Sequence, residues 1–188
     1  VVRDVCSLAR AYNVTVTAYC GERILAEDID EQTDRLAFYK EPPVEAVGPL
    51  DQCSIVGTVS MQKLIFMSDQ AIIDKLRPEA ESLLAGRATL TTALEGMLEV
   101  LPLGASKGAG VAWLLEHLGL DASGLMALGD GENDLEMLQM AALGVAMGNA
   151  GPRVKAAADE VVGTNDEDGV AQAIDKFVLS AQPVTIEK

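Results

Sequence analysis

The chain is poor in aromatic residues and in basic residues. Phe, Trp and Tyr make up only 4% of its 188 residues, which removes the stacking platforms that single-strand-binding proteins use. Lys and Arg number 14 against 29 acidic residues, giving a net charge of −15, and the basic residues are scattered. Because nucleic-acid phosphates must be neutralised by clustered Lys and Arg, we expect no nucleic-acid partner.

Cysteine and histidine are also scarce. Cys6, Cys20 and Cys53 lie far apart in the first third of the chain, and His117 is the single histidine. This spacing matches neither a zinc site nor a disulfide framework, and we expect His117 to serve the end of a helix rather than catalysis. Unpaired cysteines fit a reducing compartment, so we expect the cytoplasm or an organelle stroma such as that of the plastid.

Long apolar runs are absent as well. No segment reaches the roughly 20 residues needed to cross a bilayer. Hydrophobic residues nevertheless make up 49% of the chain, enough for a buried core. We therefore expect a soluble, globular protein without a membrane partner.

Residues 1–100 predict an α+β unit. Apolar residues recur at helical spacing from Val2 to Ala9, and residues 13–19 alternate as a strand with one buried face does. Residues 28–50 are weakly patterned and indicate a short helix with loop. The further predicted elements are strands at 23–26, 62–67, 88–92 and 97–101 and a helix at 70–84.

Residues 101–188 show a different pattern, in which predicted helices and short apolar strands alternate. Helices are predicted at 107–118, 135–141, 152–158 and 168–179, and strands at 125–128, 144–147 and 160–162. This alternation is typical of a doubly wound parallel sheet, so the fold class is α/β with an α+β unit before it. We place the boundary between residues 99 and 104, where Pro102 and Gly104 are candidate hinge residues.

The richest motif is Gly-Asp-Gly-Glu-Asn-Asp at residues 129–134, directly after an apolar strand. Ligands of open parallel sheets bind beyond the carboxyl ends of the strands. Asp130 and Asp134 therefore predict a Mg²⁺ site, and Mg²⁺ often shares its carboxylates with phosphate. An EF-hand calcium loop is excluded, because the central Gly and the terminal Glu are missing.

A second motif, Ser106-Lys107-Gly108, opens the first helix of the alternating half. The helix dipole disfavours a cation at this end, unless an anion is bound there. Lys107 is thus either a solvated surface lysine or, together with Asp130, half of a phosphate clamp.

Together these motifs resemble the haloacid dehalogenase superfamily, and within it the Cof-like phosphatases with a C2-type (IIB) cap. Residues 129–138 are similar to the family's fourth motif, Ser106–Gly108 to its third, and residues 144–150 and 165–170 to the segments that follow. The resemblance implies a partial Rossmann-like core at residues 101–188 and a partial cap at 1–100. It also implies Lys107, Asp130 and Asp134 as catalytic, Lys107 and Asn133 as phosphate-binding, and Asp130 and Asp134 as Mg²⁺-binding residues.

The implied activity is Mg²⁺-dependent hydrolysis of a small phosphorylated metabolite through an aspartyl-phosphate intermediate. The family's Asp-x-Asp nucleophile motif is not found. Asp28-Ile29-Asp30 lacks the preceding apolar strand and the following Gly-Thr. We therefore expect the chain to be the C-terminal portion of a phosphatase, inactive by itself.

Two alternatives stay open: a non-catalytic binding or scaffold module, perhaps within a larger assembly, and a phosphotransferase or mutase with the same site. If an N-terminal segment with the first core strand is missing, the sheet has an unpaired edge and uncovered apolar faces. We then expect the bare chain to self-associate.

Overall fold

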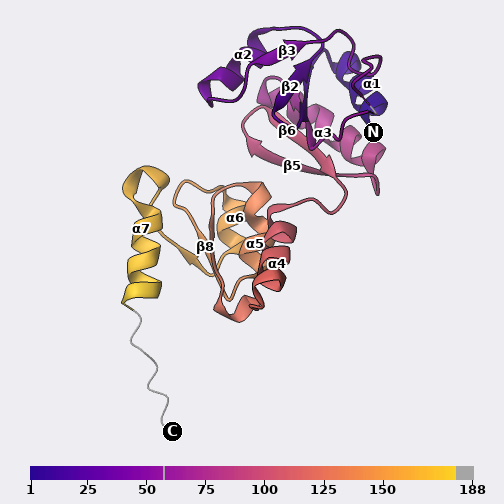
Figure 1. Cartoon of the computed structure of the whole chain (residues 1–188). Coiled ribbons are helices and arrows are strands. Elements are labelled where there is room, and N and C mark those ends of the chain that lie inside the picture. Colours follow the sequence, from indigo (N-terminus) through magenta and orange to yellow (C-terminus); the bar gives the residue numbers. More distant parts are fainter. Residues whose placement is uncertain (57, 181–188) are drawn as a thin grey trace. The chain divides into compact units, whose positions relative to one another are not determined.

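The computed structural model describes residues 1–56 and 58–180. The chain divides into two compact units, Val1–Ala105 and a second that begins at Ser106 (Figure 1). No helix in the described ranges is both long and apolar enough to cross a membrane.

The first unit is built on a six-stranded sheet with the order β3-β2-β1-β4-β6-β5. Neighbouring strands are antiparallel, except for β2 and β3, which run parallel. The elements are α1 (Val2–Tyr12), β1 (Thr15–Cys20), β2 (Arg23–Ala26), α2 (Glu31–Phe38), β3 (Val44–Ala46), β4 (Lys63–Met67), α3 (Gln70–Leu84), β5 (Ala88–Leu94) and β6 (Met97–Pro102).

Helices cover both faces of this sheet unequally. Along β4, Leu64 and Phe66 belong to the large core formed with α1 and α3, whereas Ile65 and Met67 belong to a smaller cluster with Leu36 of α2. This alternation follows from the period of two in a strand, which sends successive side chains to opposite faces. The face that α2 covers is therefore the thinner of the two.

The weakly patterned region 28–50 contains one predicted and one unpredicted element. The predicted short helix is α2, whose N-cap Asp30 accepts hydrogen bonds from the N–H groups of Gln32 and Thr33. The strand β3 was not predicted, because only three residues form it and two of them are exposed.

The second unit contains a three-stranded parallel sheet with the order β7-β8-β9, which confirms the predicted α/β fold class. Its elements are α4 (Lys107–Leu118), η1 (Ala122–Gly124), β7 (Met126–Gly129), η2 (Glu132–Asp134), α5 (Leu135–Met140), β8 (Leu143–Ala146), α6 (Pro152–Ala157), β9 (Glu160–Val161), η3 (Asn165–Glu167), α7 (Gly169–Ile174) and η4 (Asp175–Leu179).

The helix predicted at 168–179 differs from the observed one at both ends. Asp168 has a left-handed backbone (φ 57°), so the helix begins only at Gly169. The α-helical part ends at Ile174 and continues as a π-helix from Asp175 to Leu179. Periodicity locates a helix but does not distinguish α from π hydrogen bonding.

The core of the second unit is small and lies around β8. Ala127, Leu138, Ala146, Ala150 and Val154 form it. In contrast, Gly108 is the single buried residue of α4. This helix presents most of its apolar side chains to solvent.

Candidate functional site

The carboxyl ends of the parallel strands bring the predicted polar residues together. Asp130 directly follows β7, and Asn149 lies in the loop that follows β8. Asn165 lies beyond β9, at the start of η3. Polar side chains at this edge are in the position where open parallel sheets bind their ligands.

Asp134 is the buried centre of the site, with 4% of its side chain exposed. The Nζ atom of Lys107 donates a hydrogen bond to its Oδ1 at 2.5 Å. The backbone N–H groups of Asp130 and Gly131 donate to its Oδ2, each at 3.0 Å. Both oxygens are thus engaged, and Asp134 fixes the turn after β7 together with the position of Lys107.

Two glycines allow this close arrangement. A Cβ atom on Gly129 would lie 2.4 Å from the Cβ of Asp134, and a Cβ atom on Gly108 would lie 2.4 Å from the Cγ of Glu136. Both distances are far inside van der Waals contact. Any side chain at these positions would push Asp134 away from its donors or separate α4 from α5.

The first turn of α4 holds Lys107. The hydroxyl of the N-cap residue Ser106 accepts a hydrogen bond from the N–H of Ala109 at 2.9 Å and donates one to Oε2 of Glu136. Lys107 itself is disfavoured at this end of a helix, and Asp134 offsets that cost. Because 51% of the Lys107 side chain is exposed, its ammonium group can contact Asp134 and a bound anion together.

Asp130 has one carboxylate oxygen available. Its Oδ2 accepts a hydrogen bond from Nδ2 of Asn149 at 2.7 Å, whereas its Oδ1 has no hydrogen bond from the described residues. Asn149 is held in turn by the N–H of Asn165, which donates to its Oδ1 at 3.0 Å. Sequence reasoning missed Asn149 as a site residue. Its position in the sequence could have identified it, because Asn149 follows β8 as Asp130 follows β7, the strand before it in the chain.

Asn133 lies in the same turn, between the two aspartates. No hydrogen bond to its side-chain amide comes from the part of the chain that is described. A Cβ on Gly131 would lie 2.5 Å from its Oδ1, so a side chain there would require the Asn133 amide to turn aside. The amide remains available to donate to a ligand oxygen.

The side chains of this site meet the requirements of a metal ion only in part. Within the described ranges, no group of three or more His, Cys, Asp and Glu side chains could hold a metal. Mg²⁺ is usually held by one or two carboxylates together with waters and phosphate oxygens. Asp130 meets this requirement with its open oxygen, whereas both oxygens of Asp134 are engaged by protein donors.

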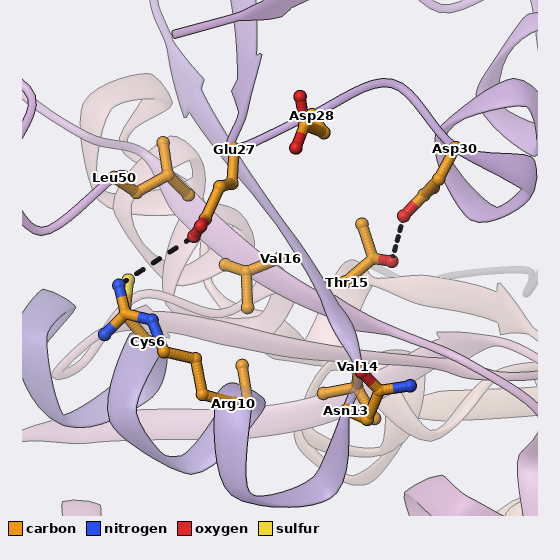
Figure 2. Close-up of a pocket in the computed structure, with 11 residues that line it drawn as sticks. Cys6, Arg10, Asn13, Val14, Thr15, Val16, Glu27, Asp28, Asp30 and Leu50 are labelled. Atoms are coloured by element: carbon orange, nitrogen blue, oxygen red, sulfur yellow. Dashed lines mark hydrogen bonds and ion pairs between the residues drawn. The ribbon is translucent and has the colours of Figure 1, made fainter. Parts of the chain in front are cut away.

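The Asp-x-Asp pair formed by Asp28 and Asp30 lies in the first unit at a pocket of about 340 Å³ (Figure 2). Asp30 accepts hydrogen bonds from two N–H groups of α2 and, at 2.5 Å, from the hydroxyl of Thr15. Its carboxylate is therefore a helix cap. Arg10 lies on the opposite wall, and its Nη2 atom is 2.6 Å from Oδ1 of Asp51 and 3.8 Å from Oε2 of Glu27.

These motifs lie in a chain that is similar to known hydrolases. Residues 1–174 match the sequence model of the haloacid dehalogenase-like hydrolase family. A solved haloacid dehalogenase-like hydrolase from Bacteroides thetaiotaomicron is 32% identical with a TM-score of 0.75, over 94% of this chain and 65% of that one.

Two curated relatives are similar over shorter parts of their own length. "Endoribonuclease YBEY, chloroplastic" from Arabidopsis thaliana is 38% identical over 181 residues, which cover 95% of this chain and 31% of that protein. "5-amino-6-(5-phospho-D-ribitylamino)uracil phosphatase YcsE" from Bacillus subtilis is 42% identical over 108 residues, which cover 57% of this chain and 41% of that protein. The matched parts are thus less than half of either relative.

Proposed function

Because the chain belongs to the haloacid dehalogenase-like hydrolases, we propose that it is part of a phosphatase that hydrolyses phosphate monoesters of small metabolites. The observation that carries this proposal is the Lys107–Asp134 contact beside the open carboxylate oxygen of Asp130. A cation and a metal-binding carboxylate together provide the positive charge that stabilises a transferring phosphoryl group. Since the chain spans less than half of its curated relatives, the activity is proposed for the whole protein.

In this proposal each site residue has a separate task. The ammonium group of Lys107 binds a phosphate oxygen, and the amide of Asn133 donates to another. Asp134 is a positioning residue, because its oxygens hold Lys107 and the turn that carries Asp130. Asn149 orients the carboxylate of Asp130.

Mg²⁺ is the proposed cofactor, and the open oxygen of Asp130 is the ligand that this chain offers it. When bound, the ion supplies positive charge next to the phosphoryl group. We propose that Asp134 supports this site through the Asp130–Gly131 turn rather than by direct ligation, because both of its oxygens already accept hydrogen bonds.

We propose that the nucleophilic carboxylate comes from residues outside these 188. Its oxygen forms a bond to phosphorus while the bond to the ester oxygen breaks, and the departing alcohol takes up a proton. Water then attacks the aspartyl phosphate, which releases inorganic phosphate and restores the carboxylate. In both steps Lys107 neutralises the charge on the phosphoryl oxygens.

We further assign the α+β unit at residues 1–100 as a cap that selects the substrate and the unit at 101–188 as part of the core. The name of the B. subtilis relative identifies a phosphorylated ribitylaminouracil as its substrate, which supports a small phosphorylated metabolite here. The name of the A. thaliana relative includes the chloroplast, which supports the plastid stroma. We assign no nuclease activity to these 188 residues, because their net charge of −15 opposes RNA binding.

The test is Mg²⁺-dependent phosphate release by the full-length protein, with p-nitrophenyl phosphate as the first substrate. We expect Lys107→Ala and Asp130→Asn each to lower kcat/KM by about 100-fold or more, because each removes charge stabilisation from the transition state. Glu116→Ala, on the exposed face of α4, is the matched control and keeps full activity. A folded full-length protein that releases no phosphate from a panel of phosphate monoesters would leave the non-catalytic binding module as the function.

A further inference from the structure

A second pocket, of about 230 Å³, lies in the first unit on the face of the sheet that α2 covers. This volume is below the range of about 300–1,000 Å³ that drug-sized ligands occupy, so it suits a single ring. Strands β1, β4 and β6 supply Tyr19, Ile65 and Met97, and the end of α2 supplies Leu36 and Tyr39. The floor is therefore aliphatic, and two walls are aromatic.

Strand register places the polar groups of this pocket. Tyr19 lies directly opposite Lys63, and Ile65 lies opposite Glu99, which makes Lys63 and Glu99 diagonal neighbours on one face. The Nζ atom of Lys63 donates to Oε1 of Glu99 at 2.8 Å and lies 4.5 Å from the centre of the Tyr19 ring. Lys63 is thus already neutralised and oriented by its two neighbours.

The electrostatics of the pocket disfavour an anion. Glu41 and Glu99 line it against Lys63 alone, so its formal charge is −1 (two carboxylates and one ammonium). No described residue is hydrogen-bonded to the hydroxyl of Tyr19, and burial raises the pKa of this group to about 12. Tyr19 therefore stays protonated at neutral pH and can donate a hydrogen bond to a ligand.

We propose that this pocket binds a planar nitrogen heterocycle that bears an exocyclic amino group and no negative charge. The ring fits between Tyr39 and the aliphatic floor, where aromatic contacts favour a flat π-system. The amino group donates to Glu99 or Glu41, and a ring nitrogen accepts from Tyr19. All residues involved lie in the first unit, which the proposed function assigns as the substrate-selecting cap, so the inference deepens that proposal. The binding test needs no phosphatase activity, and the two proposals can therefore fail separately.

Methyl NMR of the chain, selectively labelled at methionine, provides the test. The probe is 4-aminopyrimidine, and Met97→Leu assigns the Met97 resonance by its loss. We expect the Met97 methyl signal to shift saturably with the probe. Benzoate, which is planar but anionic, and cyclohexylamine, which bears an amino group but is not planar, bind at least about tenfold more weakly. The pocket disfavours the negative charge of benzoate, and cyclohexylamine has no π-face.

Variants separate the proposed contacts from a general loss of structure. Tyr39→Ala removes a 43% exposed ring and weakens binding of the probe by about 2- to 10-fold. Glu99→Gln weakens it as well. Tyr12→Phe is the control and leaves the affinity unchanged, because the hydroxyl of Tyr12 donates to Glu79 of α3 and does not line the pocket. An unshifted Met97 signal, or equal affinity for the probe and either control compound, overturns the proposal.

Discussion

At the scale of single residues, Asp134 connects the two halves of the candidate site. One of its oxygens contacts Lys107 of α4, and the other accepts two backbone hydrogen bonds from the turn after β7. A carboxylate is suited to this task because it offers several acceptor positions on two oxygens and carries the charge that Lys107 requires. The chemistry proposed for Lys107 and Asp130 therefore depends on a residue that need not contact the substrate.

Asp134→Ala tests this role through stability. The substitution leaves the partly buried N–H groups of Asp130 and Gly131 without their acceptor and removes the partner of Lys107. A fully buried donor left unpaired costs about 1–3 kcal/mol, which sets the upper limit for each group. We expect the free energy of unfolding of the second unit to fall by about 2–4 kcal/mol in urea titrations. Glu116→Ala, in the same unit, serves as the control and changes it by less than about 0.5 kcal/mol. A loss no larger than the control's would contradict the role assigned to Asp134.

The three cysteines differ in burial, and we expect them to differ in reactivity as well. Cys6 and Cys20 are 5% and 4% exposed, and burial raises the pKa of both thiols, that of Cys6 to about 11. Near pH 8 the thiolate fraction of Cys6 is then about 100-fold lower than that of an ordinary cysteine. We expect iodoacetamide to label Cys53 first, as read by peptide mass spectrometry. In urea all three should react alike; early labelling of Cys6 in the native protein would rule out this account.

At the scale of elements, contact between α4 and α5 depends on the absence of a side chain at Gly108. Gly108→Ala would bring a Cβ within 2.8 Å of the Glu136 Cβ and disturb the Ser106–Glu136 hydrogen bond. We expect a loss of about 1–3 kcal/mol in stability. Gly110 is in the same helix with nothing within 4 Å of a Cβ, so Gly110→Ala should instead stabilise by about 0.5–1 kcal/mol. Thermal unfolding of both variants checks the opposite signs, and a shared sign would refute the argument.

Ion pairs make the first unit sensitive to acid. Hydrogen bonding to Arg10 holds the pKa of Asp51 below its usual 3.8, and hydrogen bonding to Arg23 holds that of Glu45 below its usual 4.5. A lowered folded-state pKa contributes stability above the unfolded value that is lost as the pH falls through the folded one. We expect the Tm to drop between about pH 4.5 and pH 2, and Asp51→Asn to drop less steeply. An unchanged slope in the variant would show that this pair contributes nothing.

The elements that sequence reasoning predicted are those whose pattern is local. Helix α4 begins at Lys107 and ends at Leu118 as expected, because Ser106 caps its start and Gly119 ends it in a left-handed conformation. Lys107, Asp130 and Asp134 could be predicted because each lies at a strand end or a helix start, and these signals are local. The structure brings the three residues together. The strand β3 and the contact of Asn149 with Asp130 depend on which strands become neighbours. Sheet pairing between distant segments is not encoded in local periodicity.

At the scale of the whole molecule, the second unit presents apolar surface that its own core does not cover. On α4, Trp113, Leu114 and Leu118 are 64%, 46% and 58% exposed. Within the described residues, the strand β7, which Asp130 directly follows, is an edge strand of its sheet. Exposed apolar patches and open strand edges are sites where further chain or another molecule binds. The net charge of −15 opposes association between copies, and salt screens that repulsion.

We therefore expect the isolated chain to self-associate, and to do so more strongly as salt is raised. Sedimentation velocity should show a weight-average coefficient that increases with protein concentration and with ionic strength, because burial of α4 competes with charge repulsion. Trp113→Glu combined with Leu118→Glu should restore a monomer by placing charge on that face. Phe38→Glu is the control, since Phe38 is even more exposed at 83% but lies in the first unit. A chain that is monomeric at every concentration and salt level would show that α4 does not drive association.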